Sequence, residues 1–306
     1  DDVLGVNLIP GSTEFGYLPR VVTREDVGET ENANHVATRS DWAVSLDRLG
    51  ATLRNVETVS LVVTWFGTDL RLGQCEIVPK VDNGSKETSP EVWRVDGLSR
   101  DEVEVVSEVD GHPAYGGTPS DVSVVEAIQD LKARGYRVTL YPFVAMDIQA
   151  ADELPDPDGV GDQGSYPWRG RIRAGTRDKS ADARSDVETF FGRTWGFRRF
   201  ILHLAELGAQ AGLGDGDAFL IGSEMVGLTR TRDGSGAYPA TEALVDLAGD
   251  ARAILGADVA ISYAADWSEL CAWQTGDGSG DVLFPLDDLW SDAEIDFVGV
   301  DYYVPL

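Results

Sequence analysis

Cysteine, histidine and methionine are scarce in this chain of 306 residues. The 2 cysteines are too few for a disulfide scaffold and show no C-x-x-C spacing. The 3 histidines show no H-E-x-x-H or other paired spacing that would indicate a zinc site. Neither a phosphate-binding P-loop nor a G-x-S-x-G nucleophile elbow occurs. We therefore predict no metal and no cofactor.

Positive charge is scarce as well. The chain has 25 Lys and Arg against 53 Asp and Glu, which gives a net charge of −28 at pH 7. A nucleic-acid-binding surface needs clustered Lys and Arg to displace the counterions around phosphates, so we predict that no nucleic acid is bound. An anionic membrane surface is disfavoured for the same reason. The acid excess suits a solvated surface in a salty medium.

Long apolar runs are also missing. No stretch of about 18 apolar residues occurs, and we predict no membrane span. The apolar content of 42% nevertheless allows a large core. The chain starts at Asp1 without methionine and stops at Leu306 in an apolar run, so we expect a fragment of a longer polypeptide.

Short apolar runs alternate with helical patterns along the chain, which is typical of βα units around a parallel sheet. Strands are expected at 3–8, 59–67, 136–146, 217–222, 259–264 and 295–304, and helices at 41–53, 118–135, 185–211 and 239–255. We predict an α/β fold of the (β/α)8 TIM-barrel-like kind, with six units visible in a single domain over 1–306. Two long connections, 68–117 and 147–184, follow strands and are predicted as insertions on the catalytic, carboxyl-terminal face.

Carboxylates follow the predicted strands. They are Asp69, Asp147, Glu224, Asp266, Glu269 and Asp301. Most of these positions are explained equally well by turns and helix caps, where Asp is common. Glu224 differs because "FLIGSE" takes a long acidic side chain directly off a buried apolar strand. A partly desolvated carboxyl retains its proton more tightly, so Glu224 is a candidate general acid.

Aromatic side chains accompany these carboxylates. They are Trp65, Phe66, Trp168, Trp267, Tyr302 and Tyr303. A flat apolar ring beside a carboxylate suits a sugar. The C–H face of the sugar stacks on the ring, while its hydroxyls donate hydrogen bonds to the carboxylate. Aromatic residues also dominate protein cores, and the sequence leaves that alternative open.

Several ordered motifs together resemble a known family. They are "LGVNLIPG", "AYGGTPSD", "YPFVAMDI", "YPWRGRI", "FLIGSEMVGLT", "ISYAADWSE" and "DFVGVDYYVPL". The chain resembles the glycoside-hydrolase TIM-barrel-like domain of the tail hub protein of gene transfer agents and related tailed phages. The resemblance implies a virion location at the tail tip or baseplate. It also implies other tail proteins as partners, at the hub, the baseplate and the end of the tail tube.

The resemblance also implies site residues. That family is similar to retaining glycosidases whose acid/base Glu ends the fourth strand, the position of Glu224, and whose nucleophile would here lie beyond Leu306 with strands seven and eight. Ser223 stands where those enzymes have Asn, and Tyr302 where the hub family often has Asn. The predicted substrate-binding residues are Trp65, Asp69, Asp147, Trp168, Arg169, Ser223, Asp266, Trp267, Asp301 and Tyr303.

Three functional hypotheses follow from the sequence. The first is a tail-tip module that binds or hydrolyses host cell-surface polysaccharide or peptidoglycan during entry, with Glu224 protonating the leaving oxygen. The second is an inactive structural domain of the tail hub, favoured by Ser223 and the long insertions. The third is an ordinary secreted glycosidase. The acidity separately predicts that moderate salt stabilises the chain.

Overall fold

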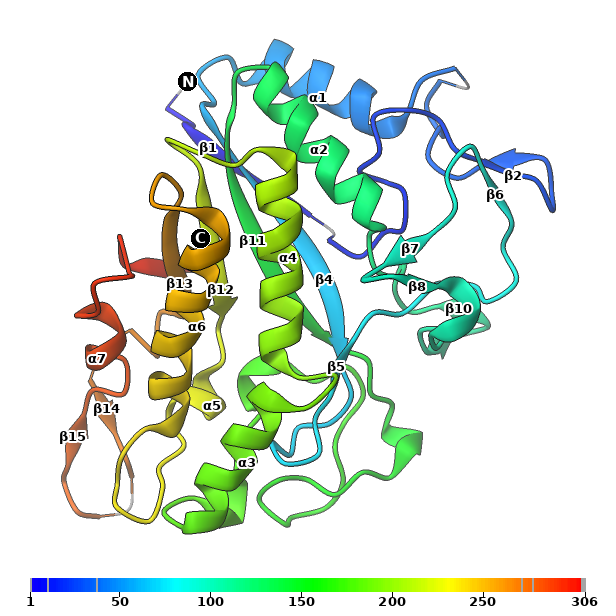
Figure 1. Ribbon diagram of the computed structural model, residues 1–306. Coiled ribbons are helices and arrows are strands. Elements are labelled where there is room, and N and C mark those ends of the chain that lie inside the picture. Colours follow the sequence, from blue (N-terminus) through cyan, green and yellow to red (C-terminus); the bar gives the residue numbers. More distant parts are fainter. Residues whose placement is uncertain (1, 10, 37, 271, 277, 304–306) are drawn as a thin grey trace. The chain divides into compact units, whose positions relative to one another are not determined.

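The central sheet follows chain order (Figure 1). The computed structural model describes residues 2–303, except 10, 37, 271 and 277. Six strands lie in the order β1 (Gly5–Leu8), β4 (Thr58–Gly67), β11 (Arg137–Met146), β12 (Ala218–Ser223), β13 (Ala260–Asp266) and β16 (Gly299–Asp301). β1 pairs with β4, and β13 with β16, in parallel, while the short β5 (Ile77–Val78) pairs antiparallel with β4. This order confirms the predicted α/β, TIM-barrel-like fold class. The last residue of the expected strand at 295–304 lies outside the described residues.

Helices connect the neighbouring strands of this sheet, as parallel pairing requires. They are α1 (Asp41–Thr52), α2 (Asp121–Ala133), α3 (Ala181–Gly192), α4 (Phe197–Ala211), α5 (Val226–Thr229), α6 (Pro239–Leu255) and α7 (Asp287–Trp290). Each crossover contains at least one of them. The chain therefore repeats the βα unit that the sequence predicted.

Helix α2 begins later than its sequence indicates. Its cap is Ser120, whose hydroxyl accepts the backbone N–H of Ser123 at 3.3 Å. The Thr118 hydroxyl accepts the backbone N–H of Lys80 at 3.1 Å and is not available as a cap. The expected helix, with Thr118 as its cap, therefore started two residues too early.

The expected helix at 185–211 is two helices, α3 and α4. Ser180 caps α3, so this helix begins four residues before the expected start at residue 185. After α3 the backbone of Arg193 is extended, with ψ of 165°. The Arg193 guanidinium donates to the carbonyls of residues 73–75 at 2.8–2.9 Å, which fixes the break between the helices.

Short antiparallel pairs, which the sequence did not reveal, occupy the long connections and the chain ends. They are formed by β2 (Thr23–Arg24) with β3 (Glu29–Thr30) and β6 (Thr88–Ser89), β7 (Arg94–Val95) with β8 (Leu98–Ser99), β9 (Glu108–Val109) with β10 (His112–Pro113), and β14 (Trp273–Gln274) with β15 (Val282–Leu283). Strands of two residues are too short to leave an alternating pattern. The connection at 147–184 contains the 3₁₀ turns η2 (Ala150–Asp152), η3 (Arg169–Arg171) and η4 (Gly175–Arg177), and the first long connection contains η1 (Arg100–Glu102).

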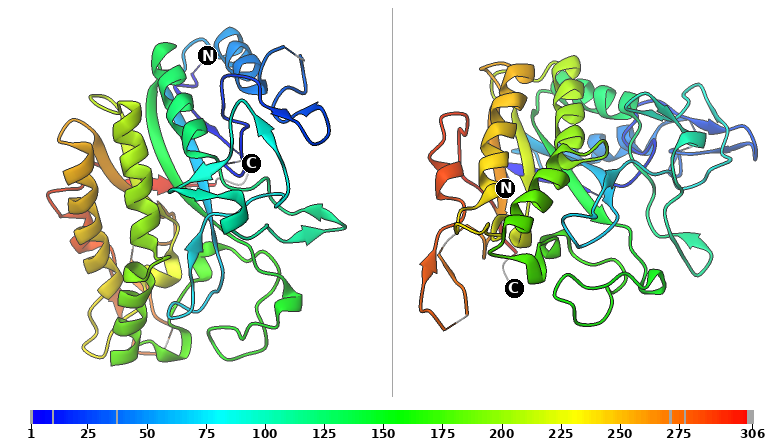
Figure 2. Two further views of the ribbon diagram at one scale, coloured as in Figure 1. Left: turned by 45° about the vertical axis from the view of Figure 1, so that its right-hand side comes forward. Right: turned by 60° about the horizontal axis from the view of Figure 1, so that its bottom comes forward.

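The chain divides into two compact units. Unit 1 comprises Asp1–Trp65, Pro79–Phe143 and His203–Ala218, and unit 2 comprises Phe66–Val78, Val144–Leu202 and Phe219–Leu306. In unit 1, α1 and α2 lie side by side (Figure 2). The Trp42 indole N–H on α1 donates a hydrogen bond to Asp130 on α2 at 2.8 Å. In unit 2, α3 and α7 pack on α6, and the rings of Phe190 and Phe197 stack with centroids 5.5 Å apart. Among the described residues, no helix has the length and apolar character of a transmembrane span.

Candidate active site

Glu224 follows directly after β12, within unit 2. Its side chain is buried, and its backbone has a φ of 52°, in the left-handed region that is unfavourable for a residue with a Cβ. The Glu224 N–H donates to the Ala264 carbonyl on β13 at 2.9 Å. The next N–H, of Met225, donates to the Tyr263 hydroxyl at 2.7 Å. Two bonds to β13 thus keep the backbone in a strained turn, a feature that clusters at functional sites.

The two carboxylate oxygens of Glu224 have different surroundings. Oε2 accepts a hydrogen bond from the Trp168 indole N–H at 2.8 Å and lies 3.0 Å from an Arg169 guanidinium nitrogen. Oε1 is buried and has no hydrogen-bond partner among the described residues. A buried carboxylate oxygen without a partner is costly in a structural role.

Arg169 fixes the neighbourhood of Glu224. It lies in η3, is buried, and donates to the Ser223 carbonyl at 2.9 Å and to the Ser223 hydroxyl at 3.0 Å. The same side chain therefore contacts three oxygens of two consecutive residues. Arg169 is well suited to this because its guanidinium is a rigid fork of donors. The serine hydroxyl is engaged by this arginine.

A buried hydrogen-bond network lies behind the turn. The Tyr263 hydroxyl, which accepts from Met225, donates to Glu269 Oε1 at 3.0 Å, and the Thr229 hydroxyl donates to the same oxygen at 2.5 Å. Burial raises the pKa of Glu269 to about 7, although the bonds it accepts oppose the rise. The strand-end pattern singled out Glu269 but not this role. The available signal was a tyrosine inside the apolar strand "ISYAAD".

Four predicted site residues lie on or after the last two strands of the sheet. Asp266 pairs with Asp301 across β13 and β16, and its Oδ1 accepts the backbone N–H of Ser268 at 2.9 Å. Trp267 is 57% exposed, and Tyr303 is 76% exposed. Partial burial and the negative charges of Glu224 and Asp301 raise the pKa of Tyr303. Tyr303 is therefore within electrostatic range of Glu224, and both aromatic rings are open to a ligand.

Trp65 does not belong with these exposed rings. It is 0% exposed in unit 1, and its ring centroid lies 5.7 Å from that of His203. His203 is itself buried, with Nε2 2.8 Å from Asp121. A fully buried indole offers no face to a sugar. The structure therefore places Trp65 in the core, and its prediction as a stacking surface is corrected.

Asp69 and Asp147 are both buried. Both oxygens of Asp69 accept from the Arg71 guanidinium, and Gln163 also donates to Asp69 at 2.8 Å. Asp69 therefore ties the two long connections together in place of facing a ligand. Asp147 is buried, and its backbone N–H donates to the Gly67 carbonyl at 3.1 Å. The structure brings together Glu224, Trp168, Arg169 and Ser223 and assigns Asp69 to a structural ion pair.

The part of the chain that carries Glu224 is similar to a known family model. Residues 195–306 match the GTA TIM-barrel-like domain. The match includes Glu224 and the network behind it, together with Asp266, Trp267, Asp301 and Tyr303. It confirms, over these residues, the resemblance seen in the sequence motifs. No curated protein matches the chain.

Solved structures that are similar to this chain include GH113 mannanases. A complex structure of a GH113 beta-1,4-mannanase has a TM-score of 0.45 and 15% identity, over 87% of this chain and 58% of that chain. A GH113 beta-mannanase from Alicyclobacillus acidocaldarius in complex with ManMIm has a TM-score of 0.38 and 14% identity, over 74% of this chain and 49% of that chain. The chain therefore spans roughly half the length of these structures.

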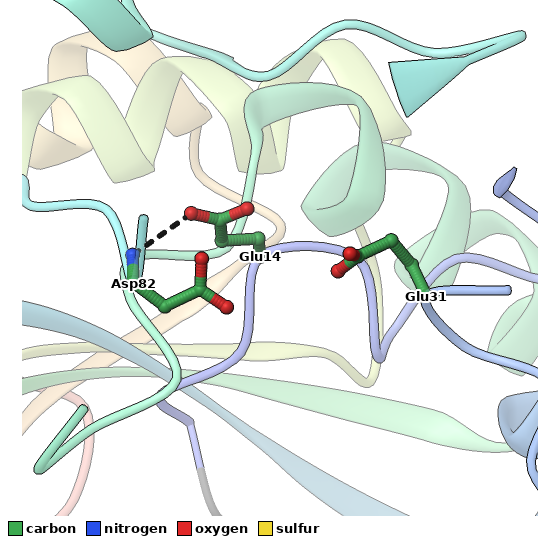
Figure 3. Close-up of side chains that lie close together, drawn as sticks. All are labelled: Glu14, Glu31 and Asp82. Atoms are coloured by element: carbon green, nitrogen blue, oxygen red, sulfur yellow. Dashed lines mark hydrogen bonds between the residues drawn. The ribbon is translucent and has the colours of Figure 1, made fainter. Parts of the chain in front are cut away.

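Outside the segment matched to the GTA TIM-barrel-like domain, three carboxylates converge with the spacing of a metal site. They are Glu14, Glu31 and Asp82 in unit 1 (Figure 3). The Lys86 ammonium lies 3.4, 2.9 and 2.7 Å from them, in that order. Burial and the charge of Glu14 raise the pKa of Asp82 to about 6. A lysine already supplies the cation of this cluster, so it is a buried ion network and not a candidate metal centre.

Proposed function

We propose that this chain is a glycan-hydrolysing module in which Glu224 protonates the glycosidic oxygen as it leaves. The observation that carries the proposal is the difference between the two carboxylate oxygens. Trp168 and Arg169 fix Oε2, while Oε1 is buried and unpartnered among the described residues. A general acid needs a fixed carboxyl with one oxygen free to donate its proton, and Oε1 becomes that oxygen when the side chains that cover it move to admit the ligand. The exposed rings of Trp168, Trp267 and Tyr303 supply stacking surfaces nearby.

The test compares the release of reducing sugar from bacterial envelope glycan by three forms of the protein. Glu224→Gln retains the size and most hydrogen bonds of the side chain but cannot donate a carboxyl proton. Its rate is expected to fall by about a hundredfold or more. Glu188→Gln, at an exposed position on α3, is the matched control for loss of one charge and should retain the wild-type rate. Equal rates for wild type and Glu224→Gln contradict the assignment.

We further propose that the module works at the tail tip of a gene transfer agent or related phage, against host envelope polysaccharide or peptidoglycan. The match of residues 195–306 supports this placement, together with the ordered motifs in the rest of the chain. Labelling purified particles with antibody against this chain tests it. We expect label at the tail tip. If the purified particles lack the protein, the proposed location is wrong.

Binding without turnover is the second candidate function. Its support is the engagement of Ser223, whose hydroxyl accepts from Arg169 at the position where the resembled glycosidases have a sugar-binding Asn. A domain of this kind would bind envelope glycan and release no sugar. Calorimetry against the same glycan separates the two functions, because measurable affinity with no Glu224-dependent release supports binding alone.

A further inference from the structure

A cavity of about 440 Å³ lies beside the candidate active site in unit 2. Its walls come from the connection at 147–184, from α5 with the residues that follow it, and from Trp273 on β14. Trp168 links the cavity to the site, because its ring lines the cavity while its indole N–H donates to Glu224. A volume of this size lies within the range of about 300–1,000 Å³ that is usual for small-ligand pockets.

Glycine backbone forms part of the cavity wall. A Cβ on Gly170 would lie 2.5 Å from the Trp168 ring, and a Cβ on Gly227 would lie 2.6 Å from the Ile172 carbonyl oxygen. Both glycines therefore permit a close approach that no larger residue allows. The packing of η3 on α5 sets the position of Trp168 between Glu224 and the cavity.

The cavity wall is rich in arginine although the chain is strongly acidic. Arg171, Arg173 and Arg230 line it, together with Asp158 and Asp178. Most of these charges are already paired. Arg171 lies 2.7 Å from Asp156, Arg173 lies 2.5 Å from Asp158, and Asp178 lies 2.8 Å from Arg232. Arg230 is the exception, because the described residues give it no ion pair within 4.0 Å.

Arg230 is fixed in place but not neutralised. One of its terminal nitrogens donates to the Ser268 carbonyl at 2.6 Å, and its Nε is buried without a hydrogen-bond partner among the described residues. Its guanidinium lies 5.2 Å from the ring centroid of Trp273, and that of Arg232 lies 5.1 Å from the same ring. Burial lowers the pKa of Arg230, although Glu269 and Asp266 oppose this. The cavity thus contains a partly desolvated cation that lacks a close anion.

We propose that this cavity binds an acidic residue of the glycan, with Arg230 as the partner of its carboxylate or phosphate group and with Trp168 and Trp273 beside the sugar ring. Arginine is suited to both anions because its donors match two oxygens at once. The proposal rests on the proposed function in that the same chain meets a glycan. It adds the substrate class, an anionic polysaccharide, to that function.

The test measures affinity by calorimetry with matched pairs of probes that differ in charge. Trigalacturonic acid is compared with its full methyl ester, and mannose 6-phosphate with mannose, so that each pair has the same ring and stereochemistry. The first pair tests a carboxylate source and the second a phosphate source. Wild type is expected to bind at least one acid about tenfold tighter than its neutral match. Arg230→Gln should abolish that difference.

Controls make the result specific. Arg199→Gln removes another arginine stacked on a tryptophan, 3.8 Å from the Trp195 centroid and outside the cavity, and should retain the preference. Arg230→Lys keeps the charge and should retain part of the preference, and it replaces Arg230→Gln if that variant does not fold. If wild-type protein shows no charge preference, or binds neither acid, the inference is overturned. If inorganic phosphate binds as tightly as mannose 6-phosphate, the sugar is not recognised and the inference is also overturned.

Binding and turnover fail separately in these experiments. Glu224-dependent hydrolysis without charge preference would retain the proposed function and overturn the acidic-glycan inference. A charge preference that depends on Arg230, with no sugar release by any form, would retain the inference and leave the chain as a binding module.

Discussion

The indole N–H of Trp168 donates to Glu224 Oε2 across 2.8 Å, although the two residues are 56 positions apart in the chain. This bond joins an insertion to the end of a sheet strand. It also leaves Oε1 as the carboxylate oxygen without a partner among the described residues. The chemistry we propose depends on that difference, and the first prediction tests it.

Trp168→Phe keeps a flat ring but removes the donor to Glu224. We expect the free energy of unfolding to fall by about 1–2 kcal/mol, since a hydrogen bond to a charged group is lost. Sugar release should fall about tenfold, because the carboxylate is fixed less well. Urea unfolding and a reducing-sugar assay measure both effects. Trp267→Phe is the stability control, because Trp267 is 57% exposed. If this variant loses as much stability as Trp168→Phe, the loss cannot be attributed to the hydrogen bond with Glu224.

Arg169 and Glu224 should be energetically coupled. Their side chains are 5% and 6% exposed, and Arg169→Gln leaves a buried carboxylate without its cation. We expect that change to cost about 3–5 kcal/mol in the free energy of unfolding. In the double variant with Glu224→Gln the cost should be smaller than the sum of the two single costs. Urea unfolding of the wild type, the two single variants and the double variant measures these costs. If the two single costs add up to the cost of the double variant, the residues are not coupled and the prediction is contradicted.

Glu269 should make stability depend on pH. Its pKa rises from 4.5 in the unfolded chain to about 7 in the folded one, so the folded state binds the proton more tightly. The resulting stabilisation is fully present below about pH 4.5 and is lost as the pH rises through 7. The wild-type free energy of unfolding should therefore lose about 1–3 kcal/mol between pH 5 and 8 from this group. Glu269→Gln should show a flatter profile, and parallel profiles would argue against a raised pKa.

Salt should stabilise the chain. The net charge is −28, and added ions screen repulsion among exposed carboxylates. We expect the melting temperature to rise when sodium chloride is raised from about 0.05 to 0.5 M, where the screening length falls from above 10 Å to below 5 Å. Thermal melts at neutral pH measure this. A flat or falling melting temperature contradicts the prediction.

The sequence predicted the central strands of the sheet well because they are apolar, whereas β16 (Gly299–Asp301) is much shorter than the strand expected at 295–304. β4, β11 and β12 are nearly continuous buried runs, and each leaves a clear signal that depends little on tertiary packing. Glu224 was identified in the same way, because an acidic residue directly after an apolar strand can be recognised from the neighbouring sequence alone. Helix limits were less well predicted, because Ser120 and Thr118 are both good caps and a bond to Lys80 decides between them.

The partners of Glu224 could be named from the sequence but not distinguished from core residues. Trp65 and Trp168 are both tryptophans next to strands or turns, yet one is 0% and the other 41% exposed. Likewise Asp69 resembles Glu224 as a strand-end carboxylate, and its hydrogen bond from Gln163 depends on how the two insertions pack. No periodicity encodes where the side chains of a long irregular connection lie. That information is tertiary.

The most direct test of the central claim compares leaving groups in Glu224→Gln. A dinitrophenyl glycoside leaves without needing a proton, whereas a glycoside with an alkyl leaving group needs a general acid. With a sugar that wild type hydrolyses, we predict that the variant loses about a hundredfold or more in kcat/KM on the alkyl glycoside and less than about tenfold on the dinitrophenyl glycoside. Equal losses on both substrates would contradict the role of Glu224 as the proton donor.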